Sequence, residues 1–365
     1  MNAKFNFKPY QPAPKYKNKH FNTIVGDLTS AHKIEGPVKS FKIPTLDQDH
    51  LTGKLYEPKK HTKEVVVMFH GLSGNCDSGY MQRTGQNFLD LGYAVLLMNH
   101  RNCGPSIGLS KQPYSSGRSE DLGKTVYEVR KLYPNRKVFL IGFSMSGNAV
   151  LLLQAKHFPL LLSHSNYLND PKFGELISSI RNHIGGKLEN PDYDKVLEEN
   201  QLNLPDFAIA VNPPANLSSV SSRFGIGLNR IYEINFMKNF RRHVRELFEN
   251  KVLQKEIPVS IFQKIEKFDD QYTAPRMGYK SAQDYYSHCS SLRFFNLIKS
   301  PTLIISAEDD PIIDATDFIP FQSHKYLDIY LEKHGGHMGY LEAGGKRWLD
   351  QTLTDIVSNW NLVKI

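Results

Sequence analysis

Short apolar runs recur along the 365-residue chain, and amphipathic segments separate them. Short runs of Val, Ile, Leu and Phe without polar alternation are typical of strands that are buried on both faces of a parallel sheet. Strands are expected at 37–44, 51–56, 64–69, 93–98, 137–143, 206–211, 302–307 and 326–332, the first two as a hairpin. Helices are expected between them, for example over 120–133 and 348–362. This alternation predicts an α/β fold with a mostly parallel central sheet of about eight strands.

Three stretches depart from the alternation. Residues 158–205 are far longer than the usual connection between a helix and the next strand, so an insertion is expected there. Residues 212–301 are mostly polar with helical periodicity, and we expect a helical cap over the sheet. Residues 1–35 are rich in Lys, Pro and aromatic residues, and we expect an extended N-terminal arm. We expect residues 36–365 to form one α/β domain that carries both the insertion and the cap.

The formal charge of +8 is concentrated in two places. Residues 1–33 hold six Lys and one Asp, and residues 223–255 hold eight Lys or Arg and three Glu, so each segment carries +5 and the rest sums to −2. Such basic surfaces are compatible with anionic lipid, nucleic acid or an acidic substrate, and equally with a solvated face that has no partner.

The composition argues against a membrane-spanning protein and against a secreted one. The mean hydropathy is −0.42, and no run approaches the ~20 apolar residues that span a bilayer. The N-terminal stretch lacks the apolar core of a secretory signal. The three cysteines are too few and too scattered for a disulfide framework or a zinc site. We therefore expect a cytoplasmic protein.

The strongest local motif follows the expected strand at 137–143. There Gly142 and Ser146 flank Ser144 at two positions on either side, and Gly147 and a helical pattern come next. Small residues around a serine between a buried strand and a helix are typical of a nucleophile elbow. The usual G-x-S-x-G becomes G-x-S-x-S-G here. A serine nucleophile needs a base beside it, so the rest of the chain must supply one.

An acid and a histidine follow in the order that such a site requires. Asp309 and Asp310 come just after the expected strand at 302–307, where side chains reach the carboxyl edge of a sheet. We favour Asp310 as the acid and keep Asp309 as a helper or surface residue. His337 lies in a glycine-rich loop after the last strand, and we expect it to take the proton of Ser144; His334 is the alternative.

Two backbone N–H groups should stabilise a developing oxyanion. Met145 directly follows the serine, and Leu72 lies in the His-Gly-Leu loop after the strand at 64–69. His70 is then expected to bond loop backbone, and Cys103 to lie in a structural turn. The sequence holds no phosphate-binding loop, no dinucleotide-binding fingerprint and no H-E-x-x-H zinc motif. We expect no cofactor and no metal.

These motifs together resemble the YheT-like α/β-hydrolases, a family that includes bacterial esterases, eukaryotic α/β-hydrolase-domain esterases and yeast ethanol acyltransferases. The resemblance covers nearly the whole chain. It rests on residues 17–24, 70–74 with Tyr80, 99–104, 142–148, 268–270, 273–275, 278–279, 284–286, 309–311 and 335–339. The cap segment near 268–286 is the most family-specific part, because the general fold does not demand it.

The resemblance implies an α/β-hydrolase fold and a serine hydrolase that cleaves carboxylic esters, including lipid-like ones, through an acyl-enzyme. An alcohol acyltransferase on the same residues, or a non-catalytic lipid-binding protein on this scaffold, is the alternative. Ser146 and the length of 158–205 depart from the family pattern. The expected partner is a small-molecule or lipid acyl ester, with peripheral contact to a membrane surface and no nucleic acid. We expect a monomer.

Overall fold

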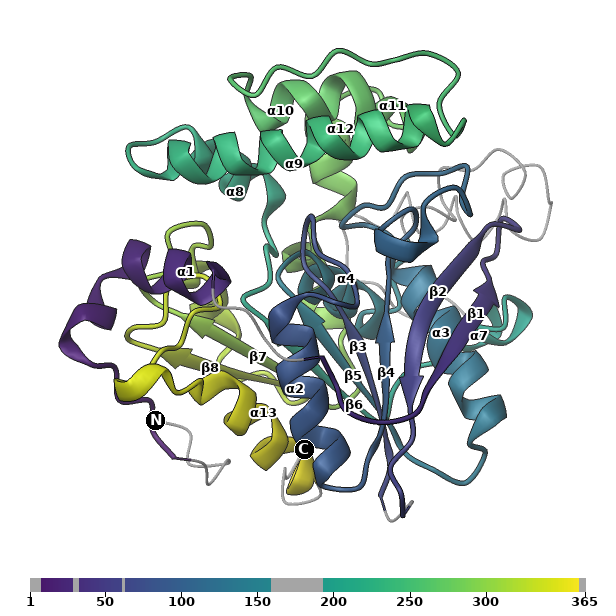
Figure 1. Cartoon of the computed structure of the whole chain (residues 1–365), viewed down its shortest axis with the longest axis vertical. Helices are drawn as coiled ribbons and strands as arrows, with labels where there is room; N and C mark the ends of the chain where they lie inside the picture. Colours follow the sequence, from purple (N-terminus) through teal and green to yellow (C-terminus); the bar gives the residue numbers. More distant parts are fainter. Residues whose placement is uncertain (1–7, 29–32, 61–62, 159–192, 361–365) are drawn as a thin grey trace.

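Eight strands form one mixed sheet in the order β1-β2-β4-β3-β5-β6-β7-β8 (Figure 1). In the computed structural model, which describes residues 8–28, 33–60, 63–158 and 193–360, β1 and β2 are antiparallel and β2 is antiparallel to β4. The remaining pairs are parallel. The strands are β1 (Val38–Pro44), β2 (His50–Tyr56), β3 (Val65–Phe69), β4 (Ala94–Met98), β5 (Val138–Phe143), β6 (Phe207–Val211), β7 (Thr302–Ala307) and β8 (Leu327–Glu332). The predicted α/β-hydrolase fold is confirmed, and each strand lies where the apolar runs predicted it.

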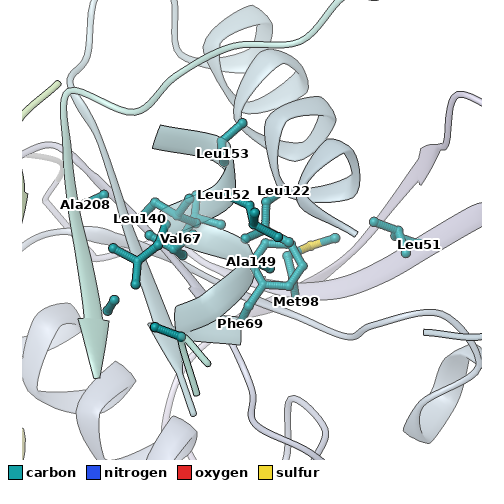
Figure 2. Packing of buried hydrophobic residues seen from close by; sticks show 14 of the residues in the cluster. Leu51, Val67, Phe69, Met98, Leu122, Leu140, Ala149, Leu152, Leu153 and Ala208 are labelled. Atoms are coloured by element: carbon teal, nitrogen blue, oxygen red, sulfur yellow. The ribbon is translucent and has the colours of Figure 1, made fainter. Parts of the chain in front are cut away.

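Helices cover both faces of the sheet, and the strands divide their side chains between them. Val65, Val67 and Phe69 of β3 belong to the core that includes α3 (Ser119–Leu132) and α4 (Met145–Gln154). Val66 and Met68 point the other way, into the core with α2 (Gly79–Asp90) and α13 (Trp348–Ser358). Figure 2 shows the first of these two cores. Burying a Val, Leu, Ile, Phe or Met side chain stabilises the folded state by about 1.5–3 kcal/mol. A strand that is apolar on both sides gains this stabilisation in full only if both faces of the sheet are covered, so the uninterrupted apolar runs favour helices on both faces.

A layer of helices lies over one edge of the sheet (Figure 1). It is built from α8 (Leu217–Phe224), α9 (Asn229–Glu249), α10 (Ile265–Phe268), α11 (Ala274–Arg276) and α12 (Ala282–Cys289). Along α9, buried residues recur three or four positions apart, as in Met237, Phe240, Val244 and Leu247. Phe240 stacks on Phe268 of α10 with ring centroids 4.7 Å apart. The layer is therefore held together by its own apolar contacts.

Shorter elements complete the described chain. They are η1 (Pro14–Lys17), α7 (Tyr193–Glu199), η2 (Gly104–Ser106), η3 (Asp269–Thr273), η4 (Ser291–Leu297), η5 (Ala315–Phe321) and η6 (Ala343–Gly345). Of the expected insertion at 158–205, residues 159–192 lie outside the described residues. Among the residues that the structure describes, no helix combines the length and apolar character needed to cross a bilayer.

The N-terminal segment differs from the extended arm that its composition predicts. Residues Lys19–Leu28 form a helix, α1, while 1–7 and 29–32 lie outside the described residues. This helix packs with polar side chains inward: Asn22 and Thr23 are buried, whereas Phe21 and Ile24 are exposed. Apolar periodicity cannot reveal such a helix, because hydrogen bonds to distant residues, and not an apolar stripe, hold it in place.

Candidate active site

Ser144 lies at a sharp turn between β5, which ends at Phe143, and α4, which begins at Met145. Its backbone has φ 50° and ψ −117°, a conformation that costs a non-glycine residue about 1–3 kcal/mol. The Ser144 N–H donates to the Val211 carbonyl at 2.8 Å, which fixes the turn to the end of β6. The strained turn places Ser144 at the carboxyl end of the sheet.

The turn requires a glycine two residues before Ser144. A Cβ atom on Gly142 would lie 2.5 Å from the carbonyl oxygen of Ser146 and 2.7 Å from a methyl of Val150. The first turn of α4 therefore packs directly on the last residues of β5. A larger residue at 142 would push the helix, and Ser144 with it, away from the sheet.

The structure brings Ser144, His337 and Asp310 together in one chain of hydrogen bonds. Ser144 Oγ lies 2.9 Å from His337 Nε2, and His337 Nδ1 lies 2.8 Å from Asp310 Oδ2. Since a carboxylate only accepts, His337 carries its proton on Nδ1 when neutral, and Nε2 is left to accept from Ser144. This is the arrangement needed to activate a serine oxygen.

Asp310 is almost completely buried, and its environment keeps it ionised. Burial alone would raise the pKa of this carboxyl, but the neighbouring His337 and the N–H groups of Ile312 and Ile313 outweigh burial and lower the pKa below its usual value. Asn212, at the end of β6, donates a further hydrogen bond of 2.7 Å to Oδ2. Asn212 is not among the site residues expected from the sequence, although its place just after a buried strand was an available signal.

Asp309, the alternative acid, faces the loop backbone instead of His337. Its Oδ1 accepts the N–H of Gly336 at 2.9 Å, and its Oδ2 lies 3.5 Å from His334 Nδ1. Burial raises the pKa of Asp309 above its usual value. The two adjacent carboxylates thus have different surroundings: Asp310 contacts His337, and Asp309 with His334 braces the loop that carries it.

The two residues expected to supply the oxyanion donors lie at the same cavity as Ser144. Leu72, Met145, Ser144 and His337 all border the same cavity. Met145 is the first residue of α4, so its N–H has no acceptor within the helix. The loop of Leu72 is fixed by the preceding residue, because the Gly71 N–H donates to the Tyr80 hydroxyl at 2.8 Å.

Ser146 does more than provide a small side chain. Its buried hydroxyl donates to the His70 carbonyl and lies 2.6 Å from His100 Nε2. Burial lowers the pKa of His100 to about 4, so His100 is neutral and donates from Nε2. The Nε2 atom of His70 accepts the backbone N–H of His100 at 3.1 Å. The Nδ1–H of His70 donates to the Gly71 carbonyl. Ser146 therefore ties the start of the helix after Ser144 to the loop that carries Leu72.

Helix α1 contacts the loop of His337 directly. Thr23 Oγ1 accepts the His337 N–H at 2.8 Å, and Asn22 Oδ1 accepts the Leu341 N–H at 3.3 Å. At Gly336, which has φ +58°, a Cβ atom would lie 2.5 Å from Thr23 Oγ1. The absence of a side chain at Gly336 thus lets α1 pack against the His337 loop. The sequence pattern did not indicate this role for the glycine.

The cavity next to Ser144 has a mainly apolar wall that the cap helices supply. Its aromatic and aliphatic lining includes Leu217, Val220, Phe224, Phe236, Phe240, Ile265, Phe268, Tyr272, Ile312 and Ile313. Asp269 also borders it and accepts the Tyr286 hydroxyl at 2.7 Å; burial raises the pKa of Asp269 to about 6. Across the described ranges, no cluster of three or more His, Cys, Asp or Glu side chains is placed to hold a metal ion.

Comparison with known proteins gives a consistent picture. A family model described as the alpha/beta hydrolase fold matches residues 64–164. The Escherichia coli protein named putative esterase YheT is 25% identical, covering 96% of this chain and 93% of its own length. Monoacylglycerol lipase from Saccharomyces cerevisiae is also 25% identical over 80% of this chain, which spans 58% of the lipase. One structure of the Pyrococcus furiosus esterase Pf2001 matches with a TM-score of 0.52 and 14% identity, covering 97% of this chain and 98% of the esterase.

Proposed function

Because this chain is a distant homologue of YheT and related esterases of the α/β-hydrolase family, we propose that it is a serine hydrolase of carboxylic acyl esters. The observation that carries the proposal is the hydrogen-bonded chain from Ser144 through His337 to Asp310 beside an apolar cavity. The proposal is also supported by two relatives, of which one is named a putative esterase and the other a monoacylglycerol lipase.

In the proposed first step, Ser144 Oγ attacks the ester carbonyl while His337 Nε2 takes the hydroxyl proton. Asp310 holds the Nδ1–H tautomer and stabilises the imidazolium that forms. The lowered pKa of Asp310 supports this role, because the carboxylate stays charged while the proton moves to His337. His337 then gives the proton to the leaving alkoxide, and an acyl group remains on Ser144.

The N–H groups of Met145 and Leu72 are the proposed donors to the oxyanion. Met145 adds the positive end of the α4 dipole, which favours developing negative charge. On the Leu72 side of this proposed oxyanion hole, Ser146 donates a hydrogen bond to the His70 carbonyl. The Gly71 N–H donates to the Tyr80 hydroxyl, and the two bonds hold the loop in place. The donors are therefore held in place before substrate arrives, and little reorganisation accompanies the reaction.

The second step releases the acid. Water, deprotonated by His337, attacks the acyl-enzyme carbonyl, and Ser144 leaves with its proton restored. The apolar residues that α8, α9 and α10 contribute to the cavity are suited to an acyl chain, whose burial would favour long over short acyl groups. Esters with an apolar acyl chain are accordingly the proposed substrates.

A fluorophosphonate probe and a series of p-nitrophenyl esters test the proposal. The wild-type protein should be labelled and should release p-nitrophenol, and Ser144→Ala should lose both. Ser287→Ala, which changes an exposed serine on α12, should lose neither. Analysis of products in a water–ethanol mixture would show whether acid or ethyl ester dominates. A wild-type protein that neither reacts with the probe nor hydrolyses any ester would refute the proposal.

A further inference from the structure

Helix α1 has its apolar side on the outside. Phe21 is 43% exposed and Ile24 is 40% exposed, and three positions of separation put them on one side of the helix. The inward side carries Asn22 and Thr23, which bond the His337 loop. A surface helix normally buries its apolar side. In α1 this pattern is reversed, because its polar side chains are buried and its apolar side chains face solvent. Contact with an apolar partner would cover this outer side.

A second group of exposed apolar side chains lies where α8 leads into α9. Ile226 is 66% exposed, Leu228 59% and Ile231 56%. The residue after Ile231 joins this region to α1, because the Tyr232 hydroxyl lies 2.9 Å from His20 Nδ1 and the two rings stack. Figure 1 shows α1 and the α8–α9 turn on the same side of the molecule. We call the five residues Phe21, Ile24, Ile226, Leu228 and Ile231 the apolar face.

Positive charge accompanies the apolar face. Lys15, Lys17 and Lys19 are exposed in the turn before α1 and at its first residue. Residues 8–28 contain four Lys and one Asp, a net charge of +3. Exposed Lys beside apolar side chains is the combination that binds the interface of an anionic bilayer. Pairing of two copies of the chain through this face would instead bring two sets of Lys together.

The apolar face is also next to the substrate cavity. Phe224 and Phe236, from the two helices that meet at the α8–α9 turn, line the cavity, and so does His337, whose backbone α1 holds. A lipid surface against this face would lie beside the elements that border Ser144. Lipid esters could then pass into an apolar cavity without crossing bulk water.

We propose that the apolar face and its three Lys residues dock the protein on an anionic lipid surface. Phe21, Ile24 and the residues of the α8–α9 turn enter the interfacial layer, while Lys15, Lys17 and Lys19 contact lipid phosphates. The delivery of lipid esters rests on the proposed ester hydrolysis, but the docking itself does not depend on catalysis.

Co-sedimentation with vesicles tests the docking, using phosphatidylcholine alone and phosphatidylcholine with 30% phosphatidylglycerol. The Ser144→Ala variant should bind anionic vesicles as the wild type does, which separates docking from catalysis. Each single Lys→Gln change at 15, 17 or 19 should weaken binding to anionic vesicles about fivefold. The double variant Phe21→Ser/Ile24→Ser should weaken binding to the same vesicles at least tenfold, and 1 M salt should do the same.

Leu132→Ser is the matched control. Leu132 is an exposed apolar residue at the end of α3, which runs back to the edge of the sheet opposite the cap, so this change should leave binding intact. Circular dichroism and hydrolysis of a short soluble ester should show that Phe21→Ser/Ile24→Ser remains folded. Absence of binding to anionic vesicles, binding that Phe21→Ser/Ile24→Ser leaves unchanged, or a dimer in light scattering that this variant abolishes would each overturn the proposal.

Discussion

Thr23 accepts the backbone N–H of His337 at 2.8 Å across 314 positions of sequence. The same hydroxyl donates to the Lys19 carbonyl one turn earlier in α1, so its lone pair is directed at the His337 loop. The side chain of His337 faces Ser144 from the other side of that backbone. Helix α1 therefore fixes the position of the imidazole relative to the serine oxygen.

Thr23→Val should lower kcat about tenfold and leave KM nearly unchanged. Valine keeps the shape of threonine but leaves the half-buried His337 N–H without its acceptor, a cost of about 1 kcal/mol or more that the loop can escape by moving. Steady-state kinetics on a p-nitrophenyl ester would measure the change. Thr23→Ser retains Oγ and should restore most of the rate. Equal losses in the two variants would show that the hydroxyl is not what matters.

Asp310→Asn and Asp309→Asn should have very different effects. The first removes the acceptor that fixes the tautomer of His337, and kcat should fall by about 10³–10⁴. The second changes a carboxylate that contacts Gly336 and His334, and kcat should change only a few fold. Both variants should keep the wild-type melting temperature within a few degrees. A comparable loss of kcat in both would mean that the two carboxylates share the role.

Ser146→Ala should destabilise the protein by about 0.5–1.5 kcal/mol, because the buried His70 carbonyl loses the Ser146 donor and keeps only His100 Nε2, at 3.2 Å. Ser146→Gly should cost about 0.5–1 kcal/mol more, since glycine in a helix adds backbone entropy to the unfolded state. Urea unfolding gives both values. If Ser146→Ala were as stable as the wild type, the bond to the His70 carbonyl would not be a stabilising feature.

Asp269→Asn should change how stability depends on pH. Burial raises the pKa of Asp269 from 3.8 to about 6 in the folded protein, so the folded state holds this proton more tightly than the unfolded chain does. The resulting stability is fully present below pH 3.8 and is lost as pH rises through about 6, by up to about 3 kcal/mol. Asparagine removes this dependence.

The measurement is the free energy of unfolding of the wild type and of Asp269→Asn at pH 5 and pH 8. The variant should gain stability relative to the wild type at pH 8 and lose that advantage towards pH 5. An identical difference between the two proteins at both pH values would show that Asp269 titrates normally.

The sheet and the order of the site residues were predictable because their signals are local. The runs that form β3, β5 and β6 are apolar on both sides. Such strands are buried on both faces, which is typical of a parallel sheet covered by helices. Ser144 directly follows β5 and Asp310 lies three residues after the end of β7, so the parallel topology alone sends both to one edge of the sheet. The structure then brings His337 between them.

Features that depend on distant polar contacts were not predictable. The composition of residues 1–35 gave no sign that Asn22 and Thr23 would be buried against residues near 340. Ser146 was interpreted only as a small residue, because its partners His70 and His100 come from two other strand ends. A hydrogen bond between residues far apart in sequence leaves no periodicity to detect.

The contact between α1 and the His337 loop also orders events during synthesis of the chain. A nascent chain exposes α1 to the ribosome surface and to chaperones hundreds of residues before its partners at 336–341 are translated. Throughout that interval its polar side has no partner in the native loop and its apolar side is exposed. The proposed proton acceptor, His337, reaches its final position only when residues 22–23 and 336–341 meet, so a translation product that stops short of residue 336 would lack the proposed activity.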